Sequence, residues 1–198
     1  VRVAWSPTFG YAQVAPEVRA LAEAAAGRFQ DLGCQVEEVE RVFADPDPIW
    51  APLFYAGVAA RLEPFLGEWR DRIDPGLLEV VEEGNRLSGV EIIKASFARA
   101  AFYQEVRQFF QRYDLLLSPT LAVPPFAAGM ERPPDYPAGS RLSWVAFTYP
   151  FNLTGHPAAT VPCGFTADGL PIGLQIVGRR LQDGLVLRAS AAFEAALP

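Results

Sequence analysis

Few side chains in this sequence could act as a nucleophile or as a general acid or base. His156 is the only histidine and Lys94 the only lysine among the 198 residues. A Ser–His–Asp triad would have to use His156, but no serine lies in the Gly-x-Ser-x-Gly turn that exposes such a nucleophile. We expect His156 to make a structural hydrogen bond and Lys94 to be a solvated charge on a helix. The available serines are at positions 6, 88, 96, 118, 140, 143 and 190.

Metal and cofactor chemistry has even less support. One histidine cannot build a multi-histidine zinc site, and Cys34 and Cys163 lack the short spacing of a metal-binding pair. No Gly-x-Gly-x-x-Gly segment indicates a dinucleotide site. We therefore expect no metal and no organic cofactor. The two cysteines are expected to be reduced, buried thiols of a cytoplasmic protein.

Two short polar segments remain as candidates for binding. Ser118-Pro119-Thr120 follows the apolar run Leu115–Leu117, and Asn152-Leu153-Thr154-Gly155 precedes an expected strand. Both segments lie at strand ends, where α/β sheets usually open their ligand crevices. The sequence predicts that the side chains of Thr120, Phe147 and Thr154 face a common cleft.

The segment between these candidates, residues 118–157, has no helical or strand periodicity. A loop of this length in a compact domain usually carries function. Its aromatic residues favour either the wall of a pocket for a partly apolar ligand or a cap over the core of the sheet, and the residues alone leave both open. These aromatic residues are Phe126, Tyr136, Trp144, Phe147, Tyr149 and Phe151.

A β-hairpin follows this loop. The strands Ala158–Phe165 and Leu170–Val177 flank Asp168-Gly169, a dipeptide typical of tight hairpin turns. Side chains alternate along the second strand, which predicts one face against a core. Pro162 has no N–H to donate, so the first strand should lie at an edge or contain a bulge.

The remaining elements predict an α/β fold. A strand at Arg2–Trp5, a helix from Pro16 to a Gly33 cap, and a strand at Cys34–Val39 indicate a parallel pair with a right-handed crossover. Periodicity and capping residues predict four more helices. They are expected at about Ile49–Leu66, Pro75–Glu83, Ser88–Tyr113 with a Ser88–Glu91 capping box, and after Asp183 as N-cap.

Composition narrows the class of protein. The apolar fraction of 51% supports one folded unit over residues 1–198. A net charge of −6 argues against a nucleic-acid partner. No apolar run has membrane length and no signal peptide is evident, so we expect no membrane partner.

Residues 152–165, NLTGHPAATVPCGF, and 169–178, GLPIGLQIVG, closely resemble the C-terminal motif of the amidase signature family. Residues 113–120, YDLLLSPT, and residues 1–40 resemble earlier parts of that family in the same order. The resemblance implies the C-terminal half of an amidase-signature fold, a mixed β-sheet covered by α-helices. Family members use a Ser–cis-Ser–Lys triad, but no Gly/Ser-rich triad segment occurs here, and Lys94 does not fit the order. No catalytic residue is assigned to this chain.

The resemblance implies a protein that hydrolyses a carboxamide to a carboxylate and ammonia or an amine, with a serine nucleophile upstream of this fragment. The fragment alone is expected to be inactive. Its expected partners are a small-molecule amide, the N-terminal half of the same polypeptide and, through exposed edges, a second copy. The alternatives are the amidase subunit of a glutamine-dependent tRNA amidotransferase or a non-catalytic binding domain. The expected pocket residues are Thr120, Phe147, Phe151, Asn152, Thr154 and Gly155.

Overall fold

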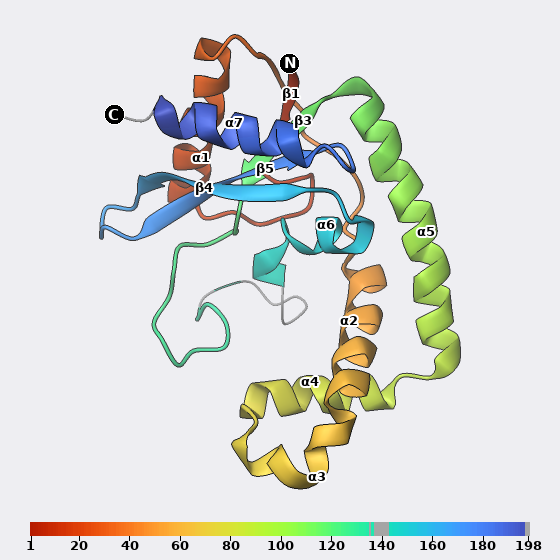
Figure 1. Ribbon diagram of the computed structural model, residues 1–198. Helices are drawn as coiled ribbons and strands as arrows, with labels where there is room; N and C mark the ends of the chain where they lie inside the picture. The colour runs from red at the N-terminus through yellow and green to blue at the C-terminus, as the bar shows by residue number, and fades with distance from the viewer. Residues whose placement is uncertain (135, 137–142, 197–198) are drawn as a thin grey trace. The chain divides into compact units, whose positions relative to one another are not determined.

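The computed structural model describes residues 1–134, 136 and 143–196 (Figure 1). The expected pocket loop, 118–157, and Ser140 therefore lie partly or wholly outside the described residues. The chain divides into two compact units, Val1–Asp45 with Tyr103–Pro198, and Pro46–Phe102. The boundary at position 102 falls inside one long helix, Gly89–Arg112, so helical periodicity continues across it.

The larger unit is built on a mixed β-sheet, as the sequence predicted. β1 is parallel to β2 and to β3, whereas β5 is antiparallel to both β3 and β4. The order in space is β2-β1-β3-β5-β4. The strands are β1 (Arg2–Trp5), β2 (Gln35–Glu38), β3 (Leu115–Pro119), β4 (Ala158–Phe165) and β5 (Pro171–Gly178).

Helices α1 (Pro16–Asp31) and α7 (Asp183–Ala195) cover one face of this sheet (Figure 1). Pro16 begins α1, where its missing N–H costs no hydrogen bond, and Gly33 follows its end with a φ of 79°. The rings of Phe29 and Phe193 stack with their centroids 5.6 Å apart and join the two helices. Apolar side chains of β1, β3 and β5 complete this core.

The hairpin of β4 and β5 matches the prediction in its turn and its edge. Gly169 has a φ of 78°, which the tight turn requires. β4 is the edge strand, and its register shifts between Pro162 and Gly164. Pro162 is thus found both at an edge and beside a bulge, the two places where a missing N–H is tolerated.

Three local predictions were wrong. β5 is buried on both faces near its end rather than on one, because the segment around Phe147 contacts the face opposite α1. The short helix α6 (Tyr149–Thr154) was not predicted, since Pro150, now found in its first turn, and Gly155, now its C-cap, indicated a loop. Asp183 is the first residue of α7 and not its side-chain cap.

The smaller unit is helical. Its elements are α2 (Asp47–Leu62), the turn η1 (Glu63–Phe65), α3 (Leu66–Trp69), the turn η2 (Arg70–Arg72), α4 (Pro75–Arg86) and the first half of α5 (Gly89–Arg112). The predicted capping box is present: the Glu91 carboxylate accepts from the Ser88 N–H, and the Glu91 N–H donates to Ser88 Oγ. In the described part of the chain, no helix is long and apolar enough to cross a bilayer.

Candidate functional site

Three polar side chains form a row across β3, β5 and β4. Ser118 is the register partner of Gln175 on one side, and Thr160 is its partner on the other. Register partners on neighbouring strands project their side chains from the same face of a sheet. Leu174 and Ile176 belong to the core under α1 and α7, so this polar row lies on the opposite face.

Gln175 is the buried centre of the polar row, with 4% of its surface exposed. Its Nε2 donates to the carbonyl oxygen of Phe147 at 2.8 Å and to Ser118 Oγ at 3.2 Å. Ser118 Oγ donates in turn to the carbonyl oxygen of Pro119 at 2.9 Å. One amide group therefore joins the loop before α6 to the middle of the sheet.

The open end of the row is a pair of threonine hydroxyls. Thr120 Oγ1 lies 2.6 Å from Thr160 Oγ1, and the Thr120 N–H donates to the carbonyl oxygen of Gly173. A Cβ on Gly173 would lie 2.6 Å from one hydroxyl oxygen and 2.8 Å from the other, so the pair needs glycine there. Thr160 is exposed and Thr120 is partly exposed. Such hydroxyls can hydrogen-bond an amide, but in the described residues no base is bonded to either.

Phe147 and Phe151 form part of a buried aromatic cluster. The ring of Phe9 packs edge-on against both, with centroid distances of 4.9 and 6.0 Å, and Phe43 contacts Phe9 and Phe151. The sequence left two alternatives open for the aromatic residues of this loop, a pocket wall and a cap over the core of the sheet. For Phe147 and Phe151 the structure matches the cap. Sequence reasoning missed Phe9, whose φ of 55° no sequence pattern indicated.

Thr154 and His156 form a separate buried group. Thr154 Oγ1 donates to the carbonyl oxygen of Pro150 at 3.0 Å, so it accepts from the Nδ1–H of His156, which lies 2.9 Å away. The imidazole stacks on Phe110 at 5.0 Å. Burial, with a smaller contribution from the Arg180 charge, lowers the pKa of His156 to about 4. His156 is thus neutral near pH 7 and makes the structural hydrogen bond that the sequence predicted.

The structure does not bring the side chains of Thr120, Phe147 and Thr154 to one common cleft, which corrects that prediction. Thr120 lies beside Gly173, near the start of β5. Gly155 lies next to Arg180, just beyond the end of β5, with roughly 17 Å of strand between Gly173 and that end. Asn152 is exposed on α6.

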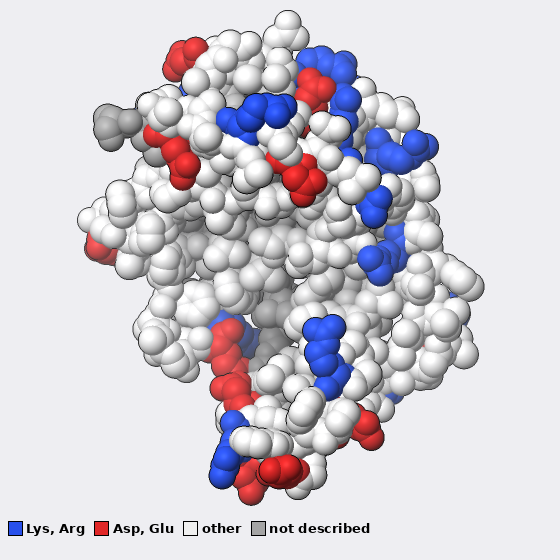
Figure 2. Space-filling model, in the orientation of Figure 1, with Lys and Arg blue, Asp and Glu red and all other residues white. Residues whose placement is uncertain are grey.

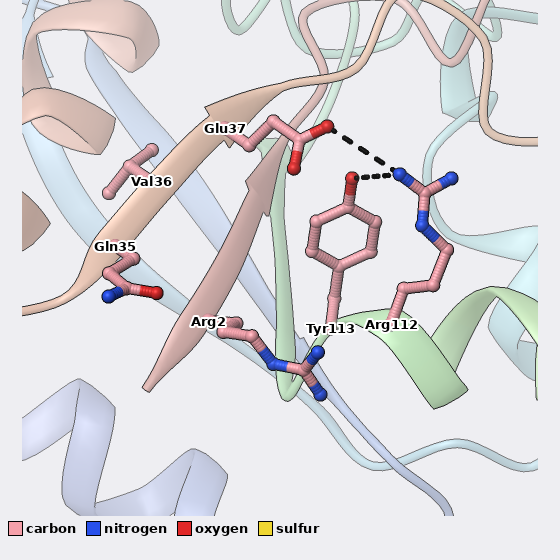
Figure 3. A pocket seen from close by; sticks show the side chains of 6 residues that line it. All are labelled: Arg2, Gln35, Val36, Glu37, Arg112 and Tyr113. Atoms are coloured by element: carbon pink, nitrogen blue, oxygen red, sulfur yellow. Dashed lines mark hydrogen bonds and ion pairs between the residues drawn. The ribbon is translucent and has the colours of Figure 1, made fainter.

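A cavity of about 300 Å³ opens beside Arg2 and Gln35, the first residues of the parallel strands β1 and β2 (Figure 3). Arg112 lies there between Glu37, at 3.7 Å, and the Tyr113 hydroxyl, at 3.4 Å. Burial and the nearby Glu37 raise the pKa of Tyr113, so its phenol stays protonated. Arg112 and Glu37 pair with each other in this cavity, and the Arg2 guanidinium donates to the carbonyl oxygen of Gln111, so the geometry indicates a structural contact.

The surroundings of the lysine and of the two cysteines, the other side chains that could act chemically, also indicate structural roles. Lys94 is exposed on α5, where its charge acts on Glu91. Cys34 and Cys163 are free thiols, as predicted, but both are partly rather than fully buried. Burial raises the pKa of Cys163 to about 11, which makes it a poor nucleophile near neutral pH.

Replacing Gln175 tests the polar row. Gln175→Leu keeps the side-chain size but leaves the Phe147 carbonyl oxygen without its donor. We expect the free energy of unfolding to fall by about 2–4 kcal/mol, measured by urea titration. Gln30→Leu, at an exposed position of α1, is the matched control and should change it by less than about 0.5 kcal/mol. Equal effects of the two changes would contradict this role.

His156 should make stability depend on pH. In the unfolded chain its pKa returns to about 6.5, so the unfolded state binds a proton between about pH 6.5 and pH 4 while the folded state does not. The free energy of unfolding therefore falls as the pH falls through this window. Because the ring is partly open to a cavity, we expect a loss on the order of 1–2 kcal/mol.

The measurement for His156 is urea unfolding at about pH 7 and about pH 5 for the wild type and for His156→Gln. The carboxylates contribute equally to both proteins. The difference between the two losses of unfolding free energy on acidification therefore reports the contribution of the His156 imidazole. We expect the variant to lose less stability on acidification. The same loss in both proteins would show that His156 is not protonated differently in the two states.

Comparisons with known proteins place these observations in a family. Residues 1–187 match the family described as Amidase. The chain is 39% identical to an acylamidase of Rhodococcus erythropolis, over 100% of this chain and 43% of that protein. A solved bacterial aryl acylamidase of the amidase signature family superposes with a TM-score of 0.83 at 30% identity, covering 100% of this chain and 44% of that one.

A subunit of an amidotransferase matches only part of this chain. One glutamyl-tRNA(Gln) amidotransferase subunit, from a Synechococcus strain, is 43% identical over 102 residues, which is 52% of this chain and 19% of that protein. The chain spans less than half the length of the relatives that it matches. The mixed sheet, the hairpin motif and the match over nearly every residue lead to one conclusion. This chain belongs to the amidase signature family.

Proposed function

We propose that these residues form the C-terminal part of an amidohydrolase, which converts a carboxamide to a carboxylate and ammonia or an amine. The observation that carries this proposal is the similarity to an acylamidase over the whole chain. The match to the amidotransferase covers only 52% of the chain, so hydrolysis with water as the acceptor is favoured over delivery of ammonia to a partner subunit. A non-catalytic binding domain is less favoured, because the relatives that match nearly the whole chain are named acylamidase and amidase.

The catalytic serine, in this proposal, comes from a segment that precedes Val1 in the complete protein. The relatives are more than twice as long as this chain, which leaves room for such a segment. Amide hydrolysis needs an activated nucleophile, a proton donor for the leaving amine and an oxyanion site at one carbonyl. In the described residues the one imidazole is bonded to Thr154 and the one lysine is exposed, which fits a nucleophile elsewhere.

The contribution of this chain would be one wall of the substrate pocket and an edge for the rest of the sheet. Thr120, paired with Thr160, offers hydroxyl groups at the surface for the substrate amide. Phe147 and Phe151 would support that wall from behind. The free edge of β4 is a place where the N-terminal half, or a second copy in an oligomer, would pair.

The first test of the proposal is ammonia release from a panel of aryl and short aliphatic amides. The complete natural protein should turn these amides over and lose activity with a serine-directed sulfonyl reagent, whereas residues 1–198 alone should show no turnover. Inhibitor-sensitive turnover by residues 1–198, with labelling of one of their own serines, would overturn the assignment of the nucleophile. Turnover of glutamine that requires a partner subunit would establish the amidotransferase instead.

The second test concerns the threonine pair. In the complete protein, Thr120→Val removes one hydroxyl while keeping the side-chain shape. We expect KM for the amide to rise about tenfold with little change in kcat, as for a group that binds ground state and transition state alike. Thr148→Val is the matched control, because that hydroxyl donates locally to the carbonyl oxygen of Val145. An unchanged KM in Thr120→Val would remove Thr120 from the pocket.

A further inference from the structure

A cavity of about 530 Å³ lies between the C-terminal end of α5 and the turn that follows β5. Three guanidinium groups line it, those of Arg107, Arg179 and Arg180. Figure 2 shows basic side chains gathered over that end of α5, at the upper right of the view. The whole chain has a net charge of −6, so this concentration of positive charge is local and opposes the overall charge.

The three arginines are not equally compensated. Arg179 is paired with Asp114 at 2.7 Å and also donates to the carbonyl oxygen of Tyr113. Among the described residues, Arg107 donates only to a neutral group, Gln104 Oε1, at 3.0 Å. Arg180 is exposed, and no carboxylate pairs with it in the part of the chain that the structure describes. Two of the three positive charges therefore have no anionic partner there.

The remaining walls of the cavity are largely apolar. Tyr103 and Phe110 both contact His156, with ring centroids 6.1 and 5.0 Å from the imidazole. Leu181 lies at the rim with 76% of its surface exposed and a φ of 66°. That conformation is costly for a leucine, and its exposure leaves apolar surface without a contact. The His156 Nδ1–H is used by Thr154, and Nε2 has no hydrogen-bond partner among the described residues.

We propose that this cavity binds a small organic anion with a flat apolar body, of the arene carboxylate type. The guanidinium groups of Arg107 and Arg180 would hold the carboxylate, because a guanidinium presents two parallel N–H donors that match its two oxygens. Tyr103 and Leu181 would contact the flat body. The volume of the cavity is in the range of small-molecule sites. This site goes beyond the proposed hydrolysis and does not depend on it.

The test is calorimetric titration of the complete natural protein with three probes. Benzoate carries both the charge and the flat body, benzyl alcohol only the flat body, and inorganic phosphate only the charge. We expect benzoate to bind with at least about tenfold higher affinity than either of the others, since charge-assisted hydrogen bonds and apolar contact act together. Benzyl alcohol binding as tightly as benzoate would contradict the charge recognition. Inorganic phosphate binding as tightly as benzoate would contradict a role for apolar contact with the flat body.

Variants that each remove one positive charge test whether benzoate binds in this cavity. Arg107→Gln and Arg180→Gln should each weaken benzoate binding about tenfold, and Arg188→Gln, an exposed arginine of α7 outside the cavity, should leave it within about twofold. Benzoate should also shift the NMR signals of the His156 ring, identified by their loss in His156→Gln. Unchanged affinity in both cavity variants, or benzoate binding without a shift at His156, would overturn the proposal.

Discussion

The buried amide of Gln175 is the interaction on which the larger unit depends. A glutamine in the middle of an apolar strand costs free energy unless its polar atoms are bonded, and here its Nε2 bonds both Ser118 and the main chain at Phe147. These bonds fix the loop before α6 against the sheet. They thereby position Phe147 over the core, while the hydroxyls of Thr120 and Thr160 pair with each other at the open end of the same row.

Much of the fold could be predicted because its determinants are local. Pro16 and Gly33 mark the ends of α1, and Gly169 marks the hairpin turn, each through a backbone conformation that the residue type favours. The strand–helix–strand spacing then determined the parallel pair. Helix α6 could not be predicted in this way, because its six residues, Tyr149–Thr154, are too few to carry a periodic pattern, and its Phe151 packs in the aromatic cluster.

The candidate site was only partly predictable, for a physical reason. Thr120 and the Asn152–Gly155 segment were found as polar groups at strand ends, but whether they meet depends on the direction of the chain between them. Gln175 and Thr160 were missed as a pair, although a polar residue inside an apolar strand is a usable signal. Thr160 becomes its partner only through the register of the hairpin, which includes a bulge after Pro162.

That bulge also limits what can pair with the outer edge of the sheet. A hydrogen-bonded ladder along β4 is interrupted at Pro162, which has no N–H, and the register has shifted by Gly164. A strand that adds to this edge can therefore pair without interruption only along Ala158–Val161. A chain segment with the wrong register, or a longer flat strand of another molecule, meets a gap after a few residues. The edge therefore discriminates between incoming strands by their length and register, before any side-chain contact is made.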